Sequence, residues 1–168
     1  MHPPMSLRDR AAGIRLLALD ADGVLTDGRI FIADASGSEW TMGFSVRDGH
    51  GVRLLIRAGL EVAVISGRDS YGLRLRLGEL GIGRSALRCR DKRAALTEML
   101  AELGLEPRQA AFIGDDLPDL PAMKQAGLAI AVADAHPDVR AAADWTTALA
   151  GGQGAVREVC DFLLAAQS

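Results

Sequence analysis

The chain has little of several things that would mark a specialised class of protein. Its 168 residues include two cysteines, Cys89 and Cys160, without C-x-x-C spacing, so neither a disulfide framework nor a cysteine metal site is expected. The three histidines, His2, His50 and His136, are too scattered for a zinc site. No apolar run approaches the roughly 18 residues of a membrane-spanning helix, and prolines stand where a signal peptide would be apolar. We therefore expect a cytoplasmic protein without a membrane partner.

Lysine is scarce as well. Only two of the 19 basic residues are lysines, Lys92 and Lys124. An ammonium is a compact charge that arginine does not reproduce, so a lysine in this background is a candidate for a specific role. The formal net charge is −3, which gives no general attraction to nucleic acid. The arginines concentrated over 74–93 are typical of a solvated helix and loop, and no nucleic-acid partner is expected.

Apolar runs that alternate with helical patterns indicate the fold class. Near-continuous apolar runs predict buried strands at 14–19, 61–65, 109–113 and 128–132, and a weaker run predicts one at 86–89. Between them, apolar residues recur at helical spacing. This alternation predicts an α/β fold with a doubly wound parallel sheet. No linker or repeat divides the chain, so residues 1–168 are expected to form one domain, ending in a glycine-rich loop and an amphipathic helix over 150–168.

One segment departs from the alternation. Residues 28–44, GRIFIADASGSEWTMGF, contain two short β-like runs around a polar turn and predict a projecting β-hairpin. Its apolar residues, among them Phe31, Trp40 and Phe44, have no helix in sequence to cover them. A two-stranded ribbon is marginal alone, so we expect it to pair with other chains in a homo-oligomer. The alternative is that it folds back on its own domain.

Polar side chains follow three of the predicted strands. Asp20 comes directly after 14–19, Ser66 follows 61–65, and Asp115 and Asp116 follow 109–113. Ligands of an open parallel sheet bind at the carboxyl ends of its strands, so these groups should converge on one crevice. Carboxylates gathered together repel one another unless a cation lies among them. Oxygen ligands favour Mg²⁺ over zinc.

Simpler interpretations remain open for single residues. The D-x-D-G that begins at Asp20 also opens an EF-hand loop, but Val24 and Phe31 occupy two of the ligand positions, which excludes that site. Asp27 is either functional or a turn residue before Gly28. Asp116 and Asp119 could each be a helix N-cap. The chain contains neither a phosphate-binding G-K-[ST] nor a G-x-S-x-G elbow.

The chain resembles the haloacid dehalogenase superfamily. The residues that carry the resemblance are D-x-D-G-x-L-T-D (20–27), S-G-R (66–68), Lys92 and G-D-D-x-x-D (114–119), in the order of the four superfamily motifs. FSVRDGHGV (44–52), AVADAHPDVRAAADWTT (131–147) and GGQGAVREVC (151–160) are similar to its capless sugar-acid phosphatase branch. The likeness covers nearly all of the chain from residue 14 onward. It implies that no separate cap domain is present.

The resemblance also implies roles for individual residues. Asp20 would be the nucleophile that forms an aspartyl-phosphate, and Asp22 would protonate the leaving sugar oxygen and then activate water. Asp20, the backbone carbonyl of Asp22 and Asp115 would hold Mg²⁺, with Asp116 assisting through water or orientation. Ser66 and Lys92 would contact the transferring phosphoryl group, Gly67 would lie beside the substrate, and Arg47 and Arg68 could bind its carboxylate; a surface ion pair is the alternative for each arginine.

The implied activity is Mg²⁺-dependent hydrolysis of 3-deoxy-octulosonate 8-phosphate, a step in lipopolysaccharide precursor synthesis. One alternative is the same chemistry on a nine-carbon sialic-type acid phosphate. A less favoured alternative is a receiver domain that accepts a phosphoryl group, in which Asp22 would have no role. Members of the branch are tetramers built through the hairpin, so a homotetramer is implied. Met42 departs from the family, which usually has lysine there, and this leaves the identity of the sugar acid open.

Overall fold

The computed structural model describes residues 6–32 and 40–168. Its centre is a six-stranded sheet in which every neighbouring pair is parallel, in the order β5-β4-β1-β6-β7-β8. The strands are β1 (Leu16–Leu19), β4 (Glu61–Ile65), β5 (Arg84–Ala86), β6 (Ala110–Gly114), β7 (Leu128–Ala131) and β8 (Trp145–Thr146). The predicted α/β fold with a parallel sheet is confirmed.

The strand order sets where a ligand can bind. From β1 the chain builds outward through β4 to β5, then returns to the other side of β1 and builds outward through β6, β7 and β8. The direction of winding therefore reverses between β1 and β6, where Leu19 pairs with Ile113. Such a reversal leaves a crevice at the carboxyl ends of the two strands. Asp20 and Asp115 follow these two strands.

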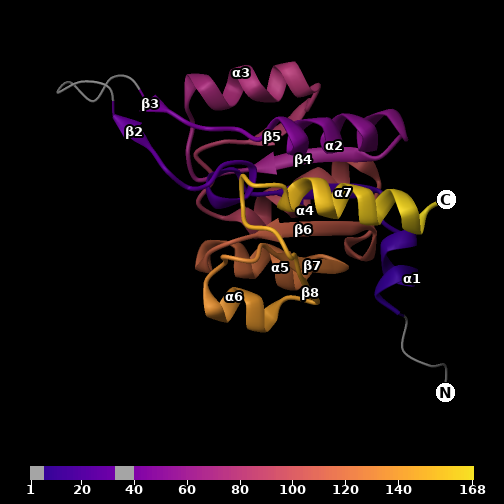
Figure 1. Cartoon of the computed structure of the whole chain (residues 1–168). Coiled ribbons are helices and arrows are strands. Elements are labelled where there is room, and N and C mark those ends of the chain that lie inside the picture. The colour runs from indigo at the N-terminus through magenta and orange to yellow at the C-terminus, as the bar shows by residue number, and fades with distance from the viewer. Residues whose placement is uncertain (1–5, 33–39) are drawn as a thin grey trace.

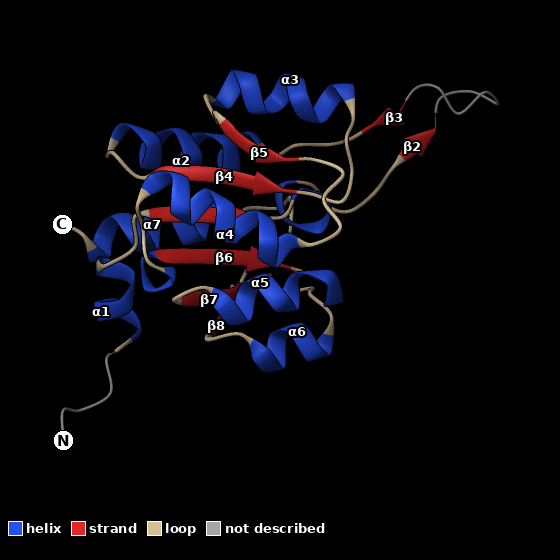
Figure 2. Ribbon diagram, turned by 180° about the vertical axis from the view of Figure 1, so that it is seen from behind, coloured by secondary structure: helices blue, strands red, loops and turns tan. Residues whose placement is uncertain are grey.

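Helices cover both faces of the sheet. α7 lies in front of the sheet in Figure 1, and α4 and α5 lie in front of it in the reversed view of Figure 2. The helices are α1 (Leu7–Ala12), α2 (Val46–Arg57), α3 (Tyr71–Leu80), α4 (Lys92–Leu103), α5 (Leu120–Gln125), α6 (Pro137–Ala142) and α7 (Ala155–Ala166). Because both faces are covered, β1, β6 and β7 are buried at every position.

Side-chain caps fix where the helices begin. Ser45 accepts a hydrogen bond from the Asp48 N–H of α2, Ser70 from the Leu73 N–H of α3, and Asp91 from the Ala94 N–H of α4. Each cap satisfies a backbone donor that the first turn of a helix leaves unpaired. The last of these caps starts α4 at Lys92.

The structure corrects two details of the predicted sheet. The strand expected at 86–89 lies at Arg84–Ala86. It is an edge strand with half-exposed polar residues, so no apolar run marks it, and the Cys89 N–H instead donates to the Ser66 carbonyl in the following loop. β8 was not predicted, since two residues are too short to show alternation.

The segment predicted as a hairpin is described in part. β2 (Phe31–Ile32) and β3 (Trp40–Thr41) pair antiparallel, apart from the main sheet, and extend away from the body of the molecule (Figure 1). Residues 33–39, where the turn is predicted, lie outside the described residues. Phe31 is 56% exposed, whereas Phe44, expected to be uncovered, packs against the core and bridges to Thr26.

None of the helices within residues 6–32 and 40–168 is both long and apolar enough to cross a bilayer.

Candidate active site

The carboxyl ends of β1, β4 and β6 open into a cleft of about 660 Å³. Most of the residues predicted for the site line it. The lining residues are Asp20, Asp22, Gly28, Gly67, Arg68, Cys89, Arg90, Lys92, Asp115, Asp116, Pro118 and Asp119.

Asp20 and Lys92 form the buried floor of the cleft. The Asp20 side chain is 11% exposed and that of Lys92 6%, and their Oδ1 and Nζ atoms are 2.8 Å apart. The same Asp20 oxygen accepts a hydrogen bond from the Ala21 N–H at 2.7 Å. Two donors therefore hold Oδ1, which leaves the second oxygen of Asp20 as the one available for reaction.

Asp119, which the sequence also allows as a simple helix cap, is central to the cluster. It is 1% exposed, and its Oδ1 lies 2.6 Å from the Lys92 ammonium. Its Oδ2 accepts the N–H groups of Asp115 and Asp116 at 3.0 and 3.2 Å. Asp119 thus fixes both the lysine and the turn that carries Asp115. The G-D-D-x-x-D motif contains this residue, but only its burial shows this role.

Three carboxylates meet at one point. Asp20, Asp115 and Asp119 each place an oxygen so that the three atoms lie within 4.8 Å of one another. Asp115 Oδ1 is buried and has no hydrogen-bond partner, although such a group normally has one. A Cβ added to Gly23, whose φ is +83°, would overlap the Asp115 carboxylate, so only glycine allows this close approach. An orphaned oxygen beside two further carboxylates fits a divalent cation with oxygen ligands, as Mg²⁺ prefers.

Burial and neighbouring charges shift the pKa values of the groups in this cluster. Burial, with the charge of Asp119, raises the pKa of Asp20 to about 6 despite Lys92. Burial, with the charges of Asp20 and Asp119, raises the pKa of Asp115 to about 8. Burial alone would lower the pKa of Lys92, but the charges of Asp20 and Asp119 outweigh it and raise that pKa. The ammonium is therefore retained, while the carboxylates lack enough positive charge around them.

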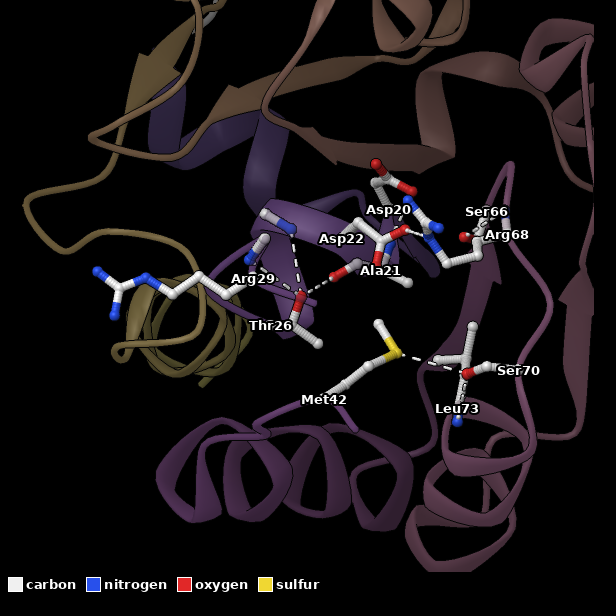
Figure 3. A network of polar contacts seen from close by, with 12 residues as sticks. Asp20, Ala21, Asp22, Thr26, Arg29, Met42, Ser66, Arg68, Ser70 and Leu73 are labelled. Atoms are coloured by element: carbon white, nitrogen blue, oxygen red, sulfur yellow. Dashed lines mark hydrogen bonds and ion pairs between the residues drawn. The ribbon is translucent and has the colours of Figure 1, made fainter. Parts of the chain in front are cut away.

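Asp22 lines the cleft and pairs with an arginine. Its Oδ2 lies 2.7 Å from Arg68 Nε, and its Oδ1 is buried without a partner (Figure 3). The Arg68 backbone N–H donates to the hydroxyl of Ser66, which is 1% exposed. The segment after β4 therefore brings Gly67 and Arg68 to the cleft that Asp20 and Asp22 line after β1, whereas Ser66 is buried beside them and is not among the lining residues.

The loop that carries Asp22 is folded around one hydroxyl. We call residues 20–28 the Asp22 loop. The buried Thr26 hydroxyl accepts the N–H groups of Gly23 and Gly28, at 3.3 and 3.2 Å, and donates to the Ala21 carbonyl at 3.3 Å (Figure 3). Three contacts through one side chain close the loop on itself and limit where Asp22 can point.

The remaining predicted residues lie less centrally. Asp116 is exposed, lines the cleft, and also caps the Leu117–Asp119 turn by accepting the Leu117 N–H, which is the cap contact that the sequence allows. Arg47 is exposed in the first turn of α2 and is not among the residues that line the cleft.

Two further residues have their contacts elsewhere. Asp27 accepts the Arg29 N–H at 3.0 Å, which is the expected turn contact. Met42 accepts a hydrogen bond from the Ser70 hydroxyl, at 3.4 Å, beside the start of α3 (Figure 3).

Known proteins are similar to this chain in both sequence and fold. A family model described as haloacid dehalogenase-like hydrolase matches residues 88–158. The 3-deoxy-D-manno-octulosonate 8-phosphate phosphatase KdsC of Yersinia pestis is 49% identical over 158 residues, which cover 94% of this chain and 83% of that protein. The protein of the same name from Escherichia coli K12 is 46% identical over the same shares.

Solved structures agree with the sequence comparison. The crystal structure of the Yersinia pestis phosphatase has a TM-score of 0.93 at 48% identity and covers 96% of this chain and 86% of that one. The phosphatase of Moraxella catarrhalis, in complex with a magnesium ion, a phosphate ion and a KDO molecule, has a TM-score of 0.92 at 42% identity. The aligned region covers 95% of this chain and 91% of the Moraxella catarrhalis chain.

Proposed function

Because the chain belongs to the haloacid dehalogenase-like hydrolases, and among them to the family of the 3-deoxy-D-manno-octulosonate (KDO) 8-phosphate phosphatases, we propose that it hydrolyses KDO 8-phosphate to KDO and inorganic phosphate. The observation that carries this proposal is the buried Asp20–Lys92–Asp119 cluster beside the unpartnered Asp115 oxygen. A carboxylate, an ammonium and a cation site at one point are what phosphoryl transfer to a side chain requires.

The first step transfers the phosphoryl group to Asp20. The oxygen of Asp20 that is free of Lys92 and the Ala21 N–H attacks phosphorus, and the bond from phosphorus to the sugar oxygen breaks. The departing oxygen takes a proton from the carboxyl group of Asp22, which lies two residues further along the Asp22 loop and lines the same cleft. The Lys92 ammonium offsets negative charge on the nucleophile and the phosphoryl group.

The second step returns the enzyme to its starting state. Asp22, now a carboxylate, accepts a proton from a water molecule as that water attacks the aspartyl-phosphate. Inorganic phosphate leaves and Asp20 is regenerated, so protons and bonds balance over the cycle. We assign to the Ser66 hydroxyl, at the end of β4, a hydrogen bond to the phosphoryl oxygens.

Asp20, Asp115 and the Asp22 backbone carbonyl are the groups we assign to Mg²⁺. Asp119 is less suited, because Lys92 engages one of its oxygens and two backbone N–H groups engage the other. When bound, Mg²⁺ supplies positive charge that allows a carboxylate to approach a phosphate dianion. Asp116 remains a candidate to assist from outside the cluster, through water or orientation.

The test compares wild type with Asp20→Asn. We expect the variant to lose essentially all activity on KDO 8-phosphate with its unfolding temperature nearly unchanged, because Asn cannot act as the nucleophile. Asp161→Asn, at an exposed acid on α7, is the matched control and should retain wild-type turnover. Substantial turnover by Asp20→Asn, or full activity in a metal chelator, would contradict the proposal. Comparing kcat/KM for KDO 8-phosphate with that for a nine-carbon sialic-type acid 9-phosphate decides between the two substrates.

We also propose a homotetramer formed through residues 28–44, without a separate cap domain. Phe31 on β2, Val46 at the start of α2 and Tyr71 at the start of α3 are 56%, 81% and 82% exposed, which favours burial by another copy of the chain. Sedimentation velocity measures this directly, and a monomer at working concentration would contradict it. The cytoplasmic location stays a prediction.

A further inference from the structure

A second buried acid lies outside the cleft and takes no part in the chemistry above. Asp48, on α2, is 1% exposed. Its Oδ1 accepts the Arg157 N–H at 2.8 Å and its Oδ2 accepts the Gly154 N–H at 3.2 Å. Both donors belong to the start of α7, where backbone N–H groups are unpaired and the helix dipole favours negative charge. Asp48 therefore ties α2 to the first turn of a helix more than 100 residues away in sequence.

The segment just before α7 lies against the Asp22 loop. We call Gly151–Gly154 the glycine strap. The Gly152 N–H donates to the Val24 carbonyl at 2.9 Å, and the Gly151 N–H donates to Asp134 Oδ1 at 2.9 Å. The backbones are so close that a Cβ at Gly151 would overlap the Gly23 carbonyl, and one at Gly152 would overlap the Asp27 N–H. The strap thus touches the Asp22 loop on both sides of its middle.

These contacts place Asp22 between two restraints. Arg68 holds its carboxylate from the cleft side. The strap supports the backbone of the next residue, Gly23, from the other side. Thr26 closes the loop internally, but nothing in that closure fixes the loop relative to the sheet. The strap contributes to this, beside the close approach of Gly23 to Asp115 and the Thr26–Phe44 bridge, because Asp48 and Asp134 anchor it to other parts of the fold.

We infer that the glycine strap, anchored by Asp48, holds Asp22 in the position from which it protonates the leaving group, which makes Asp48 a positioning residue for the reaction. This inference rests on the proposed role of Asp22. It separates two kinds of defect: loosening the strap should weaken general acid catalysis and leave the nucleophile, Lys92 and the metal ligands in place. General acid catalysis matters most when the leaving oxygen is strongly basic.

The experiment measures how kcat/KM depends on leaving-group basicity in a series of substituted phenyl phosphates, with Mg²⁺ present. These substrates contain no sugar and have nearly the same shape, so a general change in substrate binding would affect all of them alike. Gly151→Ala pushes on the Gly23 carbonyl, and Asp48→Asn turns an NH₂ toward one of the two backbone donors. For both variants we expect kcat/KM to fall about tenfold more on phenyl phosphate than on p-nitrophenyl phosphate. A positioned general acid contributes about 100-fold or more, so this effect corresponds to a partial loss of general acid catalysis.

Controls separate this inference from the function on which it rests. The controls are Gly78→Ala, where a Cβ meets nothing within 4 Å, and Asp161→Asn, on the same helix as Arg157. In a plot of log kcat/KM against the pKa of the leaving phenol, each control should give a line parallel to that of wild type. Asp22→Asn should give the steepest dependence, and an unchanged slope in that variant would contradict the role of Asp22 itself. A steep Asp22→Asn line with folded strap variants parallel to wild type would overturn the inference. If Gly151→Ala and Asp48→Asn fail to fold, Asp134→Ala is the deciding variant, because it removes only the exposed side chain that holds the Gly151 N–H. We expect it to make the dependence of kcat/KM on leaving-group basicity steeper. A dependence parallel to that of wild type would refute the role of the strap.

Discussion

Lys92 is the residue whose loss should reveal how the site is balanced. Its ammonium lies 2.8 Å from Asp20 and 2.6 Å from Asp119, and the three side chains are 6%, 11% and 1% exposed. Lys92→Met keeps the length of the side chain but leaves these carboxylates beside Asp115 without a cation. Removing one partner of a buried ion pair typically costs about 3–5 kcal/mol. We expect a loss of that size in the free energy of unfolding of the metal-free variant at pH 8.

The loss should depend on pH in a defined direction. The pKa of Asp20 is already raised to about 6 in the folded protein, above its value in the unfolded chain. An acid with a raised pKa contributes stability at low pH that disappears as the pH rises through the folded value. Without Lys92 that pKa rises further, so the stability continues to fall at higher pH. At pH 5, where the acids take up protons, the difference in the free energy of unfolding between wild type and variant should therefore be less than about half of its value at pH 8.

Urea denaturation in a metal chelator at pH 5 and pH 8 measures both values. Lys124→Met is the matched control, since Lys124 is the other lysine and is exposed on α5. It should change stability by less than about 0.5 kcal/mol. Equal losses for Lys92→Met at the two pH values, or a loss below about 1 kcal/mol at pH 8, would refute the electrostatic account of the cluster. Turnover should fall at least about 100-fold, as when a transition-state donor is removed.

Three further outcomes follow from the same geometry. Mg²⁺ at 100 times its Kd should stabilise the protein by about 2.7 kcal/mol. In thermal scans this stabilisation should be smaller at pH 5.5 than at pH 8, because the pKa of Asp115 is about 8 and protons compete with the metal for it. Equal stabilisation at the two pH values would contradict this. Arg68→Ala should lower kcat and change unfolding stability by less than about 1 kcal/mol, since the ion pair with Asp22 is partly exposed; a larger loss in urea would point to a structural role. Burial raises the pKa of Asp48, so relative to Asp48→Asn wild type should lose stability as the pH rises above about 4; a gain would reverse the argument.

Much of the fold could be predicted because its signals are local. A strand covered on both faces must be apolar throughout, so β1, β4, β6 and β7 are visible in the sequence to within two residues. The failures have the same cause. β5 is a half-exposed edge strand and β8 has two residues, so neither carries a run that composition could reveal.

The sequence by itself determined that Asp20 and Asp115 would lie in one cleft, because parallel strands end at one edge of the sheet and each of these residues directly follows a strand. Their resemblance to known motifs brought in Lys92 and the chemistry. Only the tertiary structure decided which groups touch: that Asp119 is the buried partner of Lys92, that Arg68 pairs with Asp22, and that Gly151 lies against Gly23. Such contacts join residues far apart in the chain, and the packing distances that create them leave no pattern in the order of the amino acids.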